Sequence, residues 1–235
     1  MKKQKDMYVS AVVVAAGRGS RMNMDMNKQY IEIAGKQVLA RTLQVFQDCA
    51  CIDEIVLVVN QQDILYCKQN IVDFYKYTKV SAIVAGGSER QNSVYNGLRE
   101  VHGECSIVLI HDGARPFIKA ASIIASIDAA REYGASCVAV PVKDTVKMAD
   151  KGHFVVETLD RSSLWAMQTP QTFKYEIIMD AHRKALEKGF TGTDDATLVE
   201  QSGGKVKLVM GGYDNIKITT REDLIMAEAI ANEAD

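Results

Sequence analysis

The strongest constraint on the fold of this chain is a repeated alternation between short apolar runs and stretches with helical spacing. The first run, Tyr8–Ala15, is rich in valine, which is typical of a strand buried on both faces of a sheet. Leu39, Leu43 and Phe46 share one helical face, and strands that alternate with helices predict an α/β fold with a mainly parallel sheet. Similar apolar runs lie at 55–59, 80–84, 107–110, 137–142 and 206–210, and helical spacing recurs at 92–101 and 120–133.

Residues 143–161 break this alternation. Two extended runs, 145–148 and 154–159, flank an Asp-Lys-Gly turn at 150–152 and predict a β-hairpin. The hairpin follows a predicted core strand directly, so its edges and apolar side chains would be left in water. We therefore expect an arm that docks on a second copy of the chain and makes a homodimer. The alternative is a hairpin that packs on its own domain.

Length and composition limit the kind of protein. The 235 residues suit one domain, 1–235, with the arm at 143–161. The net charge of -2 argues against a nucleic-acid partner, so an anion site would need a local cluster of basic groups. The five cysteines do not have zinc-ligand spacing. Reduced thiols, no targeting signal and no membrane-spanning apolar run predict a cytoplasmic protein without a membrane partner.

The segment 15–28, after the first strand, is rich in glycine and basic residues. Gly17 and Gly19 would let backbone N–H groups approach an anion, and Arg21 and Lys28 add positive charge. A bis- or triphosphate is the expected ligand, because charge-assisted hydrogen bonds to phosphate oxygens are strong. The position also fits, since ligands of open α/β sheets bind at the carboxyl ends of strands.

Other phosphate-binding loops fit this segment poorly. A dinucleotide-binding fingerprint needs a third glycine where Met22 stands. A P-loop needs a Gly-Lys-Ser/Thr sequence, which the segment lacks. On the two glycines alone, an ordinary surface loop with basic residues is an equal alternative.

Later strand ends carry further candidate residues. Gly87, Ser88 and Ser93 belong to a glycine-rich turn and the helix after it, where backbone groups and small side chains could read the edge of a base. Taken alone, this motif is more typical of a plain strand–helix turn with a glycine pair. Asp112 follows another strand and could accept hydrogen bonds from ribose hydroxyls or approach a magnesium ion. His111 is interpreted as structural, because an attacking phosphate oxyanion needs no base.

Two more positions allow two interpretations each. Thr193 precedes two aspartates at the start of a predicted helix, which fits either a helix N-cap or a ligand contact. Lys217 stands between two isoleucines in a predicted short strand, 215–218, so it points to the face opposite to theirs. There it contacts either solvent or a phosphate.

Together these motifs resemble the 2-C-methyl-D-erythritol 4-phosphate cytidylyltransferase family over nearly the whole chain. The resemblance depends on the order and spacing of several short motifs, none of which is decisive alone. They are Ala15-Ala16-Gly17-x-Gly19-x-Arg21-Met22 with Lys28-Gln29-Tyr30, Gly86-Gly87-x-x-Arg90 with Ser93-Val94, His111-Asp112-Gly113-Ala114-Arg115-Pro116, Asp144-Thr145, Asp160-Arg161 with Leu164-Trp165, Thr169-Pro170-Gln171, Thr193-Asp194, and Asn215-Ile216-Lys217-Ile218-Thr219.

The resemblance implies a Rossmann-like, three-layer nucleotidyltransferase fold with a protruding, dimerising β-hairpin arm. It also implies a reaction of CTP with 2-C-methyl-D-erythritol 4-phosphate that gives 4-diphosphocytidyl-2-C-methyl-D-erythritol and pyrophosphate, a step of non-mevalonate isoprenoid synthesis. Mg²⁺ is the implied cofactor, held mainly by the CTP phosphates.

The same resemblance implies roles for individual residues. The catalytic cations would be Arg21 and Lys28 on the triphosphate, with Arg161 and Lys217 on the sugar phosphate. The CTP-binding residues would be Ala15, Ala16, Gly17, Gly19, Gly87, Ser88, Ser93, Asp112 and Gly113. The sugar-phosphate contacts would be Thr145, Arg161, Thr169, Thr193 and Lys217, with Thr145 and Arg161 reaching across from a partner's arm. Ser88 departs from the acidic residue common in the family, which weakens only a role for its side chain.

Two other functions are compatible with these motifs. A polyol-phosphate cytidylyltransferase, such as one acting on ribitol 5-phosphate, would use the same phosphate clamps and differ in a few side chains. The Ala-Ala-Gly start of the loop and the segment 160–165 favour methylerythritol phosphate instead. A non-catalytic nucleotide-binding module could share the fold, but it would not need two opposed sets of cations.

Overall fold

A mixed, mostly parallel sheet forms the centre of the molecule. The structure is a computed structural model that describes residues 7–17 and 28–234. Its seven-stranded sheet has the order β11-β7-β10-β6-β1-β4-β5, and only β10 runs antiparallel to its neighbours. The strands are β1 (Tyr8–Ala15), β4 (Glu54–Val59), β5 (Val80–Ala85), β6 (Cys105–Asp112), β7 (Ala135–Pro141), β10 (Trp165–Lys174) and β11 (Lys207–Met210).

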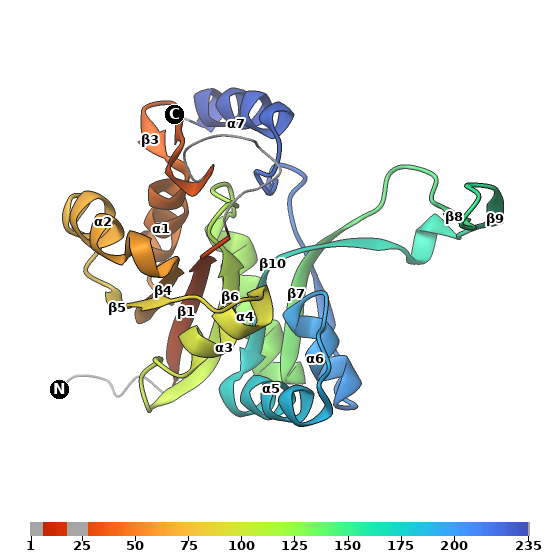
Figure 1. Ribbon diagram of the computed structural model, residues 1–235, viewed down its shortest axis with the longest axis horizontal. Coiled ribbons are helices and arrows are strands. Elements are labelled where there is room, and N and C mark those ends of the chain that lie inside the picture. The colour runs from red at the N-terminus through yellow and green to blue at the C-terminus, as the bar shows by residue number, and fades with distance from the viewer. Residues whose placement is uncertain (1–6, 18–27, 235) are drawn as a thin grey trace.

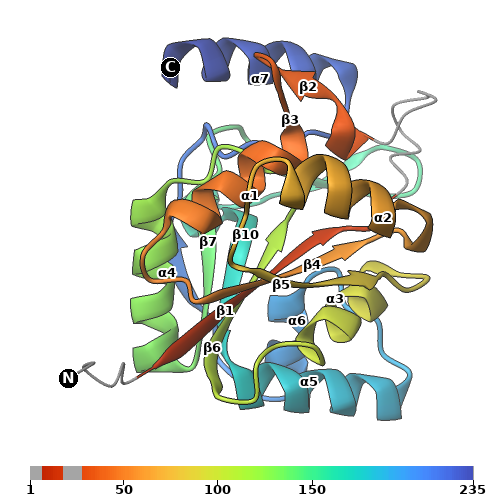
Figure 2. The same ribbon diagram turned by 90° about the vertical axis from the view of Figure 1, so that its left-hand side faces the viewer.

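Helices cover both faces of this sheet and complete three layers (Figures 1 and 2). One face packs on α1 (Val38–Asp48) and α4 (Ala120–Tyr133). The other packs on α3 (Arg90–Leu98), α5 (Tyr175–Lys188) and α6 (Asp195–Gln201). Along β1, Val13 belongs to the first core and Val12 to the second. Successive residues of β1 are therefore buried on opposite faces, which explains its unbroken valine-rich run and confirms the predicted fold class.

A smaller layer lies beside the main sheet, next to the start of α1. The short hairpin of β2 (Glu32–Ile33) and β3 (Lys36–Gln37) packs against α7 (Arg221–Ala234), as Figure 2 shows. Remaining short elements are η2 (Lys28–Tyr30), η3 (Gln61–Asp63), α2 (Ile64–Cys67), η4 (Lys68–Asp73) and η5 (Arg161–Ser163).

The predicted hairpin is confirmed as β8 (Lys147–Ala149) paired antiparallel with β9 (Val155–Thr158). In Figure 1 it extends well away from the body of the molecule. Its apolar side chains lie in solvent within the single chain, since Phe154 is 75% exposed and Val156 is 62% exposed. The hairpin therefore presents an apolar surface that its own domain does not bury.

The strand β10 was not predicted from the sequence. Pro170 stands in its middle, and a proline usually argues against a central strand because it cannot donate to the ladder. The pairing with β7 shifts register between Met167 and Gln171, so Pro170 lies where that ladder is interrupted. The strand is thus compatible with its proline, and it fills the sheet between β6 and β7.

The prediction of a strand at 215–218 was wrong. The structure has irregular backbone there, and the Ile218 N–H donates to the Ala114 carbonyl at 2.9 Å. Ile218 is fully buried beneath α7, whereas Lys217 points to the opposite side. The expected opposition of the two side chains is therefore present without a strand.

Candidate active site

The carboxyl ends of β1, β4, β5 and β6 border a cleft of about 760 Å³. The chain runs from β1 to β4 and β5 on one side and then returns to β6 on the other. Such a reversal of strand order is where open α/β sheets bind their ligands. Of the predicted site residues, Ala15, Ala16, Gly17, Gly87, Ser88, Ser93, Asp112 and Lys217 line this cleft.

Two turns approach each other closely at the floor of the cleft. A β-carbon at Gly86 would collide with the Ala16 side chain, so this contact requires glycine. The Ser93 hydroxyl accepts a hydrogen bond from the Gly87 N–H at 3.0 Å and donates to the Glu89 carbonyl at 3.0 Å. Ser93 therefore shapes the turn that would face a base.

The predicted anion loop, 15–28, lies partly within the described residues. Gly19 and Arg21 lie outside the described residues, and Lys28 is the first residue of η2. Gly17 lines the cleft without a left-handed φ, and a β-carbon there would meet nothing within 4 Å. After the loop, the buried Gln29 side chain donates to the Ala15 carbonyl at 2.9 Å and ties η2 to the end of β1.

Asp112, at the end of β6, is the electrostatic centre of the cleft. Its carboxylate lies 2.7 Å from Lys217 Nζ, 3.3 Å from Arg90 Nε and 4.0 Å from Arg115 Nε. Burial alone would raise the pKa of Asp112, but Arg90, Lys217 and Arg115 outweigh it and hold the pKa well below its usual range. Asp112 is therefore an ionised acceptor at the cleft wall.

A chain of hydrogen bonds supports Asp112 from beneath. The Thr169 hydroxyl accepts from the Asp112 N–H at 3.1 Å and bonds to His111 Nδ1 at 3.0 Å. His111 Nε2 lies 3.1 Å from the Arg115 carbonyl, which can only accept, so the neutral ring carries its proton on Nε2. This buried arrangement fits the structural role expected for His111. It also places Thr169 behind Asp112, outside the lining of the cleft.

Asp194 and Thr193 differ in what they do at the start of α6. Asp194 is the N-cap, because its carboxylate accepts from the Thr197 N–H at 2.9 Å. Thr193 is exposed, and its hydroxyl lies 3.4 Å from that of Thr197. The N-cap interpretation thus applies to Asp194 and not to Thr193.

The arm residues are not brought to the cleft within the single chain. Thr145 and Arg161 are both exposed at the base of the arm, and Arg161 Nη1 donates to the Lys143 carbonyl at 3.0 Å. Figure 1 shows the arm extending away from the sheet on the side of β7 and β10. Neither Thr145 nor Arg161 lines the cleft of its own chain.

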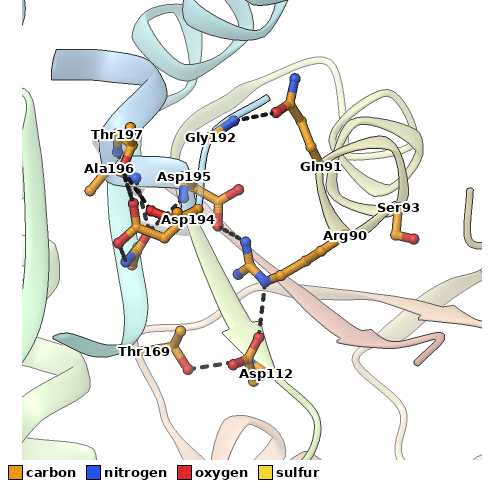
Figure 3. A network of polar contacts seen from close by, with 12 residues as sticks. Arg90, Gln91, Ser93, Asp112, Thr169, Gly192, Asp194, Asp195, Ala196 and Thr197 are labelled. Atoms are coloured by element: carbon orange, nitrogen blue, oxygen red, sulfur yellow. Dashed lines mark hydrogen bonds and ion pairs between the residues drawn. The ribbon is translucent and has the colours of Figure 1, made fainter. Parts of the chain in front are cut away.

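Sequence reasoning assigned no role to Arg90 and Asp195, although both belong to the site's polar network. Figure 3 shows Arg90 between two carboxylates, with Nη1 at 2.8 Å from Asp195 Oδ2 and Nε beside Asp112. Arg90 follows the Gly86-Gly87 turn in a recognised motif, which was the available signal. Asp195 looks like an ordinary acidic residue in the first turn of a helix, and its 1% exposure cannot be read from sequence.

Comparison with known proteins agrees with this architecture. The sequence profile of the family described as 2-C-methyl-D-erythritol 4-phosphate cytidylyltransferase matches residues 9–233. The chain belongs to this family. A cytidylyltransferase of that name from Caldanaerobacter subterraneus is 54% identical over 222 residues, which cover 94% of this chain and 98% of the relative. Another from Clostridioides difficile is 49% identical over 226 residues, covering 96% and 94%.

Solved structures of the family share the fold. The 4-diphosphocytidyl-2C-methyl-D-erythritol synthase of Anaerococcus prevotii superposes with a TM-score of 0.85 at 37% identity and covers 96% of both chains. The 2-C-methyl-D-erythritol 4-phosphate cytidylyltransferase of Thermus thermophilus gives a TM-score of 0.78 at 31% identity, covering 96% of this chain and all of that one. The Rossmann-like fold predicted from the sequence is confirmed.

The cleft of this cytidylyltransferase-family chain fits a divalent cation that has few protein ligands. Within residues 7–17 and 28–234, no group of three or more His, Cys, Asp or Glu side chains could hold a metal ion. Asp112 brings a carboxylate to the cleft wall, and Glu89 also lines the cleft, with its side chain accepting from the backbone in the first turn of α3. An ion that takes most ligands from phosphate oxygens and water, as Mg²⁺ commonly does, suits this donor set. Over the same part of the chain, no helix is long and apolar enough to cross a membrane.

Two buried histidines should make the stability of this family member depend on pH. Burial lowers the pKa of His111 to about 4, and burial together with Arg90 lowers that of His182 to about 4. Between pH 6.5 and 4 the unfolded chain binds protons that the folded chain does not, so stability falls as pH falls. We expect each histidine to lower the free energy of unfolding by about 2 kcal/mol at pH 5 relative to pH 8.

Urea denaturation of His182→Gln at both pH values measures this effect. The variant should lose the His182 share of the pH-dependent difference, about 2 kcal/mol, by the same linkage. His153→Gln is the matched control, because His153 is exposed and should leave the difference intact. A His182→Gln protein that loses as much stability at pH 5 as the parent would contradict the neutral, buried state of His182.

Proposed function

We propose that this chain is a CTP-dependent nucleotidyltransferase that converts 2-C-methyl-D-erythritol 4-phosphate and CTP to 4-diphosphocytidyl-2-C-methyl-D-erythritol and pyrophosphate. The observation that carries the proposal is the ionised Asp112 paired with Lys217 in a cleft where the family's glycine-rich turns converge. Relatives of that name share about half of their residues with this chain over nearly its full length. Neither a ribitol 5-phosphate substrate nor a non-catalytic module is favoured by these comparisons.

The chemistry is an in-line displacement at phosphorus. An oxygen of the sugar phosphate attacks the α-phosphorus of CTP, a new P–O bond forms, and the bond to the β-phosphate bridging oxygen breaks to release pyrophosphate. Positioning and electrostatics dominate such reactions. Two unit negative charges at ~4 Å repel by roughly 4 kcal/mol at an effective dielectric near 20, so the site must supply opposing positive charge.

Different residues of the cleft are proposed to bind the nucleotide and the sugar phosphate. The backbone of Ala16 and Gly17, with the Gly87 turn opposite, faces the space proposed for the nucleotide. Asp112, being ionised, is suited to accept hydrogen bonds from ribose hydroxyls. Lys217 is 37% exposed and is held by Asp112 at the cleft wall, where it can meet an incoming phosphate.

The remaining assignments extend the family resemblance. Arg21 and Lys28 are proposed to stabilise charge on the triphosphate, with Gly19 beside them and Gly113 at the ribose. Thr169 and Thr193 are proposed to lie near the sugar phosphate, Thr169 by acting through the Asp112 backbone. Mg²⁺ is the proposed divalent ion, and when bound it would offset triphosphate charge while Asp112 and Glu89 line the adjacent wall.

The arm is proposed to make a homodimer in which each copy completes the other's site. Its exposed apolar surface, Phe154, Val155 and Val156, supports this arrangement, because isolated hairpins of this kind need a partner to bury them. Thr145 and Arg161 would then contact the sugar phosphate of the second copy. We place the protein in the cytoplasm, without nucleic-acid or membrane partners.

Pyrophosphate release tests the proposed reaction. Purified protein is incubated with Mg²⁺, each of the four NTPs, and either methylerythritol 4-phosphate or ribitol 5-phosphate. We expect release only with CTP and methylerythritol 4-phosphate, and a kcat about 10²–10³ lower in Arg21→Ala. Arg131→Ala is the control, because Arg131 is exposed on α4 and does not line the cleft. Release only with ribitol 5-phosphate would shift the function to polyol phosphates, and no release with CTP would refute it.

Mixing two inactive variants tests the arm. Arg161→Ala and Lys217→Ala proteins are each expected to have low activity, because each lacks one cation on the sugar phosphate. After mixing under conditions that exchange subunits, mixed dimers would have one site with both residues intact, so activity should recover. Arg21→Ala mixed with Lys217→Ala is the control without recovery, since both residues then belong to the same chain's cleft. Recovery in the control, or none in the test mixture, would contradict sharing across the arm.

A further inference from the structure

Asp195 is the first residue of α6, yet it does not behave as a solvated helix-start acid. Its side chain is 1% exposed, and the N-cap role is already filled by Asp194. Burying a carboxylate is unfavourable unless a partner compensates for the lost water. A buried carboxylate at Asp195 therefore needs a partner of opposite charge nearby.

The main chain at this point does not depend on the Asp195 carboxylate. Gln171 Oε1 accepts from the Asp195 N–H at 3.0 Å and the Ala196 N–H at 2.9 Å, and Gln171 Nε2 donates to Asp194 Oδ2 at 2.8 Å. The capping bond from the Thr197 N–H to Asp194 adds a further tie. The helix start is thus held by Gln171 and Asp194, which leaves the Asp195 side chain for another purpose.

The partner of the Asp195 carboxylate is Arg90. Its guanidinium joins Asp195 to Asp112, with Nη1 2.8 Å from Asp195 Oδ2 and Nε 3.3 Å from Asp112 Oδ1 (Figure 3). Burial lowers the pKa of Arg90, but the two carboxylates outweigh it and raise the pKa above its usual value. Arg90 is therefore a fixed positive charge, and it also lines the cleft.

Two basic side chains, Arg90 and His182, lie close to the Asp195 carboxylate. Its other oxygen, Oδ1, lies 4.0 Å from His182 Nε2, and that ring is neutral at physiological pH because burial lowers its pKa to about 4. Burial raises the pKa of Asp195, with smaller contributions in the same direction from Asp112 and Asp194, and Arg90 opposes the rise. Arg90 is accordingly the cation that balances Asp195.

We propose that Asp195 is a positioning residue for nucleotide binding, acting through Arg90. By occupying one end of the guanidinium, it stops Arg90 from closing both N–H donors onto Asp112. Asp112 then keeps one oxygen for Lys217 and its acceptor capacity for the nucleotide. Without the Asp195 charge, Arg90 turns fully toward Asp112 and competes with the ligand. The role rests on the proposed function, since it concerns the CTP side of the same cleft.

The test is Asp195→Asn, which keeps the shape and removes the charge. We expect the KM and the calorimetric Kd for CTP to rise about tenfold, the value of one charge-assisted hydrogen bond, with a smaller change in kcat. Asp180→Asn is the matched control, because Asp180 is a surface aspartate paired with Lys184 and should leave both constants unchanged. Unchanged CTP constants in Asp195→Asn would overturn the proposal.

A double-mutant cycle separates positioning from a merely structural role. Arg90→Lys keeps a positive charge but cannot join two carboxylates, so it should weaken CTP binding alone. Asp195→Asn should then add little further weakening in the Arg90→Lys background, whereas a structural role would give additive losses. If Asp195→Asn does not fold, Arg90→Lys alone decides, and normal CTP binding by it would overturn the proposal. Calorimetry with CTP needs no turnover, so an inactive parent would refute the proposed reaction while leaving the positioning role testable.

Discussion

The ionised Asp112 carboxylate, held among Lys217, Arg90 and Arg115, is the interaction on which the rest of the site depends. A buried carboxylate is unfavourable by itself, and only surrounding cations with good geometry offset the loss of water. Each cation comes from a different part of the chain, so the carboxylate brings the end of β6, the start of α3 and the irregular segment before α7 to one place. The Asp112 carboxylate thus links three segments that form the wall of the cleft.

The sheet explains why these parts can meet. Because β1 lies between β4 and β6, the chain must cross over β1, and a gap opens at the carboxyl edge where the crossover begins. The antiparallel β10 then closes the other side of β6 and contributes Thr169 beneath Asp112 and Gln171 at the start of α6. The polar network is therefore a property of strand order, and it extends the site from the nucleotide turns toward Thr193.

Local patterns in the sequence predicted much of this architecture. Strands buried on both faces leave unbroken apolar runs, and a hairpin leaves two extended segments around a turn, so β1 and the arm could be found directly. The strand β10 could not, because Pro170 conceals it and only tertiary pairing makes it a strand. The same limit applies to Asp195 and Arg90. Burial and the sharing of one guanidinium by two carboxylates arise from contacts between distant segments, which local spacing does not record.

The most direct test of this account removes the central charge and leaves the shape. In Asp112→Asn, calorimetry should show CTP binding weakened by about tenfold or more, and the KM for the sugar phosphate should rise because Lys217 loses the partner that holds it. Both effects should appear in a protein whose circular dichroism matches the parent. Unchanged affinity for CTP together with an unchanged sugar-phosphate KM would contradict the claim that Asp112 organises the site.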